Sequence, residues 1–162
     1  MKAAPCKILG ALAAIGLSGL VAACGSKPPP PPPPTVVSLN FAATADVNPD
    51  LSGRPSPVII RYYQLAATGA FDSADYFQLR DKEAALLGPA LLDRQDLALT
   101  PGAKQDVQLQ PKPEAKFIGL VASYRDIDNA GWRAEVAIPP NKTTTIKVQV
   151  DKLKLSISSE SK

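Results

Sequence analysis

The side chains that enzymes use most often for catalysis are scarce in this chain. Its 162 residues include no histidine, two cysteines and 15 aspartate and glutamate residues. Ser-His-Asp and Cys-His nucleophilic sites need an imidazole base, and most zinc sites need His or Cys ligands, so none of these sites is expected. An enzymatic activity would have to rest on Asp, Glu, Lys, Ser or Tyr alone.

The clearest arrangement of carboxylates is the segment DIDNAG, Asp126–Gly131, which resembles the opening of a calcium-binding loop. Position five is Ala130 and position twelve is Ala137, however, so two ligands are missing. We interpret the segment as a turn between two strands. A cell-wall hydrolase working through Asp126 and Asp128 is a weaker alternative, because a turn would have to bring two alternating residues to one face. We therefore expect no metal, no cofactor and no enzymatic activity.

Cys24 is the side chain for which the flanking sequence specifies a chemistry. It follows a positively charged start and a run of apolar and small residues, Ile8–Val21, which is the pattern of a secretory signal. That run falls short of the ~20 strongly apolar residues that a membrane-spanning helix needs. The residues Val21-Ala22-Ala23-Cys24 resemble the bacterial lipobox, in which the cysteine is acylated; an ordinary signal peptide with a chance cysteine is the alternative. We predict lipidation of Cys24, and Gly25 in place of Asp after it implies sorting to the outer membrane.

Cleavage before Cys24 also changes the charge balance. It removes Lys2 and Lys7, which leaves 16 of the 18 lysines and arginines against 15 acidic residues. This near balance, without a basic cluster, argues against nucleic-acid binding. The seven prolines at 28–34 predict a polyproline II rod of roughly 20 Å that acts as a spacer. We expect four parts: a lipoprotein signal peptide (1–23), an acylated cysteine with a proline linker (24–35), a folded domain (36–158) and a C-terminal tail (159–162).

The folded domain has the sequence pattern of β-strands. Apolar or β-branched residues alternate with polar ones from Thr144 to Val150 and again from Leu153 to Ile157. Further short runs, most of them separated by Pro, Gly and Asn residues, are Val36–Ala45, Val58–Leu65, Leu97–Leu99, Val107–Leu109, Phe117–Tyr124 and Trp132–Ile138. About seven or eight short strands are typical of an all-β, antiparallel β-sandwich.

One segment, FDSADYFQL at Phe71–Leu79, interrupts this rhythm. It predicts a short helix with Asp72 as the N-cap, and a second helical turn is expected from Asp81 to Leu87. We expect the charged residues near this segment to form a solvated surface without specific pairing: Lys82, Glu83, Asp93, Arg94 and Asp96.

The loop between the first two strands, DVNPDLSGRPSP at Asp46–Pro57, is the most informative connection. It is far longer than an ordinary hairpin loop of about two to five residues, and long structured loops often carry function. Its prolines reduce the entropy that is lost on binding, and Arg54 offers a planar group with several donors. A rigid connector between the two sheets is an equally supported alternative.

Several ordered segments together carry a resemblance to a known family. They are the lipobox cysteine, NPDLSGRPSPVIIRYYQL (Asn48–Leu65), FDSADYFQL (Phe71–Leu79), FIGLVASYRDIDNAGWR (Phe117–Arg133) and TIKVQVDKLKLSI (Thr145–Ile157). Over essentially the whole chain after the prolines, the sequence resembles the TssJ (SciN) family of type VI secretion lipoproteins. The resemblance implies a transthyretin-like β-sandwich with an added helical element. It also implies a position at the periplasmic face of the outer membrane and binding to the periplasmic C-terminal region of TssM, in a complex with TssL.

The resemblance implies a binding site as well, because the family's partner contact involves the loop between the first two strands. We transfer this contact to the corresponding loop of this sequence as a whole. The expected contact residues are Asp46, Asn48, Pro49, Asp50, Gly53, Arg54, Pro55 and Ser56. The proline rod departs from the family pattern and leaves the distance between membrane and domain open. A periplasmic small-ligand carrier is the alternative function, and it would require a sizeable apolar pocket with convergent polar groups.

Overall fold

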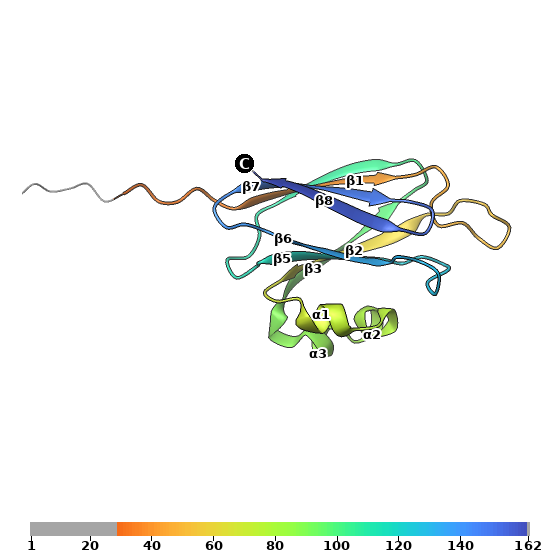
Figure 1. The fold of residues 1–162 in the computed structure, drawn as a ribbon, viewed down its shortest axis with the longest axis horizontal. Coiled ribbons are helices and arrows are strands. Elements are labelled where there is room, and N and C mark those ends of the chain that lie inside the picture. The colour runs from red at the N-terminus through yellow and green to blue at the C-terminus, as the bar shows by residue number, and fades with distance from the viewer. Residues whose placement is uncertain (1–28, 162) are drawn as a thin grey trace, which may run out of the picture. The chain divides into compact units, whose positions relative to one another are not determined.

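The computed structural model describes residues 29–161 (Figure 1). Cys24, the predicted signal peptide and the start of the linker therefore lie outside the described residues. The chain divides into two units, Met1–Pro31 and Pro32–Lys162. In the first unit, the described prolines 29–31 are exposed and belong to no helix or strand. Within the described part of the chain, no helix is long and apolar enough to cross a membrane.

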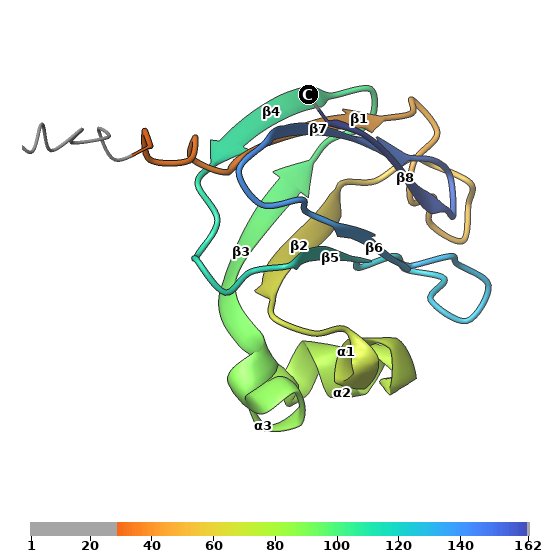
Figure 2. The same cartoon turned by 60° about the vertical axis from the view of Figure 1, so that its left-hand side comes forward.

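The second unit is built from two four-stranded sheets packed face to face (Figures 1 and 2). The strand order is β4-β1-β7-β8 in the first sheet and β3-β2-β5-β6 in the second. The strands are β1 (Val36–Ala43), β2 (Val58–Leu65), β3 (Leu91–Leu99), β4 (Lys104–Leu109), β5 (Phe117–Ala122), β6 (Arg133–Ala137), β7 (Thr143–Val150) and β8 (Leu155–Ser161). The predicted β-sandwich is confirmed.

Two details of the sheets differ from the prediction. The strands β1 and β7 pair in parallel, with Val36 opposite Thr143 and Ala43 opposite Val150, whereas the other pairs of neighbouring strands among residues 29–161 are antiparallel. Parallel pairing is possible here because the two strands are far apart in the sequence and no tight hairpin joins them. The last strand also continues to Ser161, opposite Thr144. Residues 159–161, predicted as part of a tail, therefore belong to β8.

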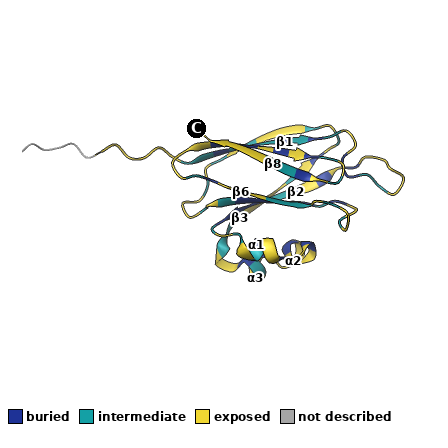
Figure 3. Ribbon diagram, viewed as in Figure 1, coloured by how far each residue is buried: buried dark blue, intermediate teal, exposed yellow. Residues whose placement is uncertain are grey.

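The main core fills the space between the sheets. Alternate residues of β1 and β7 face inward, and Val37, Leu39 and Ile146 are fully buried there. They pack against the facing sheet, to which Ile60 of β2 and Leu120 of β5 contribute. Figure 3 shows buried residues, in dark blue, interspersed with more exposed ones along the strands. The period-two pattern of the sequence corresponds to this division between buried and exposed faces.

A helical segment between β2 and β3 covers the outer face of the second sheet (Figures 1 and 2). It consists of α1 (Gly69–Ser73), α2 (Tyr76–Asp81), α3 (Glu83–Leu87) and the 3-10 turn Gly88–Ala90. A second core lies beneath it, where Tyr63 and Leu65 of β2 pack with Phe71, Leu79 and Leu87. The second half of β2, Tyr62–Leu65, is therefore buried on both faces.

The helix N-cap differs from the one predicted. The helix α1 begins at Gly69, so Asp72 lies inside it, and the prediction of Asp72 as the N-cap was wrong. Asp75 caps α2 instead, because its backbone is extended and its carboxylate accepts a hydrogen bond from the Gln78 backbone N–H at 2.8 Å. The Gln78 side chain accepts one from the Asp75 backbone N–H at 3.0 Å, which completes a capping box.

Glu83, Arg94 and Asp96 are paired, which contradicts the expectation of a solvated surface without specific pairing, whereas Lys82 is exposed as expected. Glu83 is buried. Its carboxylate accepts hydrogen bonds from Arg61 and Tyr63 at 3.0 Å each and forms an ion pair with Arg94 at 2.8 Å. Arg61 also pairs with Asp96, which lies opposite it on β3. Burial, followed by the charge of Glu83, raises the pKa of Tyr63, and the hydrogen bond from Arg61 lowers the pKa of Asp96. This network connects the helical segment to β2 and β3.

Gly119 of β5 provides a test of the contact between the helical segment and the sheet. A Cβ atom at Gly119 would lie 2.9 Å from Leu65 Cδ1 and 2.9 Å from Phe71 Cζ. We expect Gly119→Ala to lower the free energy of unfolding by about 1–3 kcal/mol, measured by urea denaturation, because the second core would be overpacked. Gly69→Ala is the matched control, since nothing lies within 4 Å of its added Cβ. Equal midpoints for the two variants would contradict this packing.

Candidate functional site

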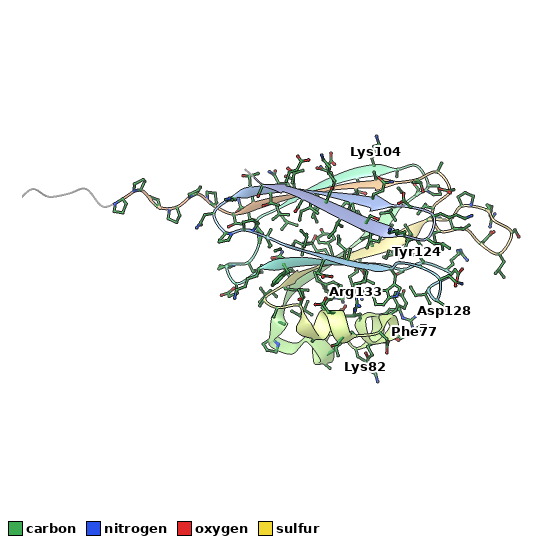
Figure 4. All side chains as sticks on the ribbon, viewed as in Figure 1. Phe77, Lys82, Lys104, Tyr124, Asp128 and Arg133 are labelled. Atoms are coloured by element: carbon green, nitrogen blue, oxygen red, sulfur yellow. The ribbon has the colours of Figure 1, made fainter. Side chains whose placement is uncertain are left out.

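Of the connections between strands at one end of the sandwich, three surround one surface, and we call them together the loop end. They are the β1–β2 loop (44–57), the β5–β6 connection (123–132) and the β7–β8 turn (151–154). Figure 1 shows them side by side, and Figure 4 places Tyr124 and Asp128 toward the same end. The Gly131 N–H donates to Leu153 O and the Leu155 N–H donates to Gly131 O, each at 2.8 Å, so the second and third connections are joined.

Asn48 links the β1–β2 loop to the other two connections. It is only 2% exposed, and its backbone N–H donates to Lys152 O at 3.0 Å. Its side chain donates to Pro57 O at 2.7 Å and accepts from the Arg125 backbone N–H at 2.8 Å. Its φ of 49° lies in the left-handed region, which Asn tolerates better than most residues. One buried side chain thus fixes the base of the loop end.

The base of the β1–β2 loop is closed by two further buried residues. Val47 is fully buried in the main core, and its carbonyl accepts a hydrogen bond from the Ser56 N–H at 3.1 Å. The hydroxyl of Ser56, which is 5% exposed, donates to Arg54 O at 3.4 Å. Of the predicted contact residues, Asn48 and Ser56 are therefore oriented into the protein.

The tip of the same loop, Asp50–Arg54, forms a compact hydrogen-bonded turn. The Asp50 N–H donates to Arg54 O at 2.9 Å, and one carboxylate oxygen of Asp50 accepts from the N–H groups of Ser52 and Arg54 at 2.9 and 3.0 Å. The other oxygen pairs with Arg54 Nε at 3.1 Å, and Gly53 supplies the positive φ of 78° that the turn requires. The tip has a defined shape in the absence of a partner.

The hydrogen bonds to its carboxylate lower the pKa of Asp50, with that from the Arg54 backbone contributing most. The pKa of Asp50 is therefore higher in the unfolded chain than in the folded one, and the hydrogen bonds to its ionised carboxylate stabilise the tip at neutral pH. That support is lost as the pH falls through the lowered pKa.

The remaining predicted residues are accessible. Asp46, Gly53, Arg54 and Pro55 are exposed, while Pro49 and Asp50 are half-buried. The β1–β2 loop thus brings all eight predicted residues into one connection but divides them between an exposed part and a buried base. Leu51 is fully exposed, at 110% of its reference area, and sequence reasoning missed it. The available signal was an apolar residue inside the turn sequence DLSG.

A hollow of about 860 Å³ lies between the tip and the other two connections. It is lined by Pro49, Asp50, Leu51, Ser52, Gly53, Arg125, Asp126, Lys152 and Leu153. Asp126 accepts two hydrogen bonds from Asn129 Nδ2, at 2.9 and 3.1 Å, and the Asp126–Gly131 segment forms the predicted turn between β5 and β6. Among residues 29–161, no group of three or more His, Cys, Asp or Glu side chains is placed to hold a metal ion.

Tyr124 supports this surface from below. Its side chain is buried, and its hydroxyl donates to Asp151 O at 3.1 Å across the β5–β6 and β7–β8 connections. Burial, followed by the nearby charge of Asp151, raises the pKa of Tyr124, so the phenol remains a donor at neutral pH. The loop end consequently has the features of a preformed binding surface: a fixed base, a rigid tip and an open hollow between them.

Comparison with solved structures gives three informative similarities. The chain is 30% identical to the T6SS lipoprotein TssJ1 from Pseudomonas aeruginosa, with a TM-score of 0.77 over 79% of this chain and 98% of that one. It is 28% identical to Serratia marcescens Lip, a membrane bound component of the Type VI Secretion System, with a TM-score of 0.72 over 78% and 98%. A chain in a structure of the T6SS protein TssM C-terminal domain (869-1107) from EAEC is 26% identical, with a TM-score of 0.61 over 76% and 97%.

No curated protein sequence matches the chain. A family model described as type VI secretion lipoprotein, VasD, EvfM, TssJ, VC_A0113, matches residues 35–153. The match begins just before β1 and includes all but the last residue of the loop end. It describes a family of secretion lipoproteins and not of enzymes. Since the match covers most of the chain and the structural similarities agree with it, this protein belongs to the type VI secretion lipoprotein family that includes TssJ.

Proposed function

We propose that this protein is a lipid-anchored adaptor of the type VI secretion membrane complex, and that its loop end binds the periplasmic C-terminal region of TssM, which assembles with TssL. The rigid, exposed tip at Asp50–Arg54, held on a buried base, is the observation that carries the proposal. A preformed loop loses little conformational entropy on binding, so more of the contact energy contributes to affinity. Similarity to chains in structures of a type VI membrane complex and of the TssM C-terminal domain supports the choice of partner.

The direction of β1 supports the anchoring part of the proposal. The chain enters this strand at Val36 and leaves it at Ala43, where the β1–β2 loop begins. Eight residues at about 3.3 Å each separate the two ends of the strand by about 25 Å. A domain tethered through its N-terminus thus carries the tip at the end remote from the tether. We propose acylated Cys24 as that tether, at the periplasmic face of the outer membrane.

Within the β1–β2 loop we propose two roles. The exposed and half-buried residues contact the partner: Asp46, Pro49, Asp50, Gly53, Arg54 and Pro55. Asn48 and Ser56, which are buried, hold those residues in place. The two roles predict different effects of mutation.

The anchor can be tested with Cys24→Ser. We expect this variant to keep its thermal unfolding midpoint and its affinity for the TssM region but to leave the membrane fraction on sedimentation, because the acylated thiol is lost. Cys6→Ser is the matched control and should remain with the membrane, since Cys6 lies in the predicted signal peptide. Membrane retention of Cys24→Ser would overturn the anchor.

The binding loop can be tested by replacing Asp50–Arg54 with Gly-Ser-Gly-Ser-Gly while Asn48 and Ser56 are kept. We expect the affinity for the isolated TssM region, measured by calorimetry, to fall by about 100-fold or more, because the tip supplies the contact surface. The unfolding midpoint should change little, since the tip packs against nothing in the core. Pro113-Glu114→Gly-Ser, in the exposed β4–β5 connection at the other end of the sandwich, is the control. An unchanged affinity of the tip variant would refute the loop assignment.

The supporting role of Asn48 has its own test. Asn48→Ala leaves Pro57 O and the Arg125 N–H without their partner and places Ala at a positive φ. We expect a loss of about 2–4 kcal/mol in the free energy of unfolding and faster hydrogen exchange of the Arg125 amide. Asp46→Ala, at an exposed position two residues earlier, should change the free energy of unfolding by less than about 0.5 kcal/mol. Normal protection of the Arg125 amide in Asn48→Ala would show that Asn48 does not fix the loop end.

A further inference from the structure

Within the described residues, three large apolar side chains are strongly exposed: Leu51 at 110%, Phe77 at 51% and Ile59 at 50%. Phe77 on α2 is partly covered, because the Arg80 guanidinium lies 4.9 Å from its ring centroid and the Tyr76 ring packs at 5.3 Å. Ile59 lies on β2 with half of its side chain in contact with neighbours. Leu51 differs from both, because its side chain is fully accessible to water.

The fold does not require an exposed leucine at position 51. The turn around it is held by the Asp50 carboxylate and by backbone groups, so a polar residue at position 51 would satisfy the same geometry. A leucine there leaves apolar area in water that burial elsewhere would stabilise. Because the turn is rigid, inserting Leu51 into a partner would cost little side-chain and backbone conformational entropy.

The surroundings of Leu51 have the composition of a protein–protein interface. The hollow beside it is bordered by Arg125 and Lys152, which are exposed and form no salt bridge within residues 29–161. Asp50 and Asp126 border the same hollow, so its lining carries two acidic and two basic side chains. An apolar residue inside a polar rim of both charges is the usual anatomy of a protein–protein interface, whereas a membrane-binding surface carries basic residues in excess.

We infer that Leu51 is the anchor residue of the loop end, and that its side chain inserts into an apolar pocket on the TssM C-terminal region. The inference rests on the proposed function and goes beyond it by assigning the main contact to one side chain that lies outside the predicted contact set. Arg125 and Lys152, from the other two connections, face polar or acidic groups at the rim of that pocket. A lipid surface is a poorer occupant, because the tip lies at the end of β1 remote from the point where the tethered chain enters.

The test measures binding of the full mature chain, lipidated and in detergent micelles, to the TssM region by calorimetry. We expect Leu51→Ala to weaken binding by about tenfold or more and Leu51→Asp by about 100-fold or more. Leu51→Met should stay within about threefold, because methionine fills an apolar pocket of similar size. The heat-capacity change of binding should be less negative for Leu51→Ala, since less apolar surface is buried. All three variants should unfold at the wild-type temperature, because Leu51 packs on nothing in the free protein.

One matched control separates this effect from a general loss of surface apolarity. Phe77→Ala removes an exposed apolar side chain of α2 that belongs neither to the tip nor to the lining of the hollow, and it should bind as the wild type does. Wild-type affinity of Leu51→Asp would overturn the inference while the proposed function stands. Absence of binding by the wild-type chain would overturn both. Leu51-dependent sedimentation of the Cys24→Ser chain with vesicles of phosphatidylethanolamine and phosphatidylglycerol, together with unchanged affinity of Leu51→Asp for TssM, would overturn it in favour of a membrane contact.

Discussion

The burial of both faces of the second half of β2, Tyr62–Leu65, is the constraint on which the rest of this structure depends. One face contributes Ile60 and Tyr62 to the core between the sheets, and the other contributes Tyr63 and Leu65 to the core beneath the helices. A strand with two buried faces needs a covering layer on each side, and here a sheet supplies one layer and the helical segment the other. The residue before β2, Pro57, accepts the hydrogen bond from Asn48 that fixes the base of the loop end. The same strand therefore connects the fold to its candidate binding surface.

The charged network around Glu83 follows from that arrangement. Arg61 is the one charged residue of β2, and its guanidinium reaches Glu83 of α3 and Asp96 of β3. A buried carboxylate is costly unless it is fully paired, and Glu83 receives donors from Arg61, Tyr63 and Arg94. The network thus fixes how the helical segment lies on the sheet, and Gly119 lets Phe71 approach closely beneath α1.

The loop end combines a rigid scaffold with an exposed apolar tip, and the two properties have separate causes. Rigidity comes from hydrogen bonds within the tip and from Asn48 at the base, and it lowers the entropy lost on binding. Affinity, in our proposal, comes from burying Leu51 inside a polar rim. This division explains why a loop that packs against little can still present a defined surface to a partner.

The sequence alone indicated most of the strands, the inserted helical segment and the family, but it predicted only Leu97–Leu99 of β3, which begins at Leu91. Alternation of apolar and polar residues located the strands, because a strand between core and solvent must alternate, and the segment around Phe71–Leu79 indicated the inserted helices. The sequence was insufficient to predict contacts between residues that lie far apart along the chain. The parallel pairing of β1 with β7 and the partners of Glu83 are of this kind, since local patterns contain no information about pairing across a sheet or between layers.

For the candidate site, the sequence by itself determined that the β1–β2 loop is long, rich in proline and part of a type VI secretion lipoprotein. Only the tertiary structure decided which of its residues are available for contact. Asn48 and Leu51 are three positions apart, yet Asn48 is buried by hydrogen bonds to Pro57, Arg125 and Lys152, whereas Leu51 is fully exposed at the tip. The exposure of a loop residue depends on the connections packed beside it, and two of those connections lie about 70 to 100 residues further along the chain.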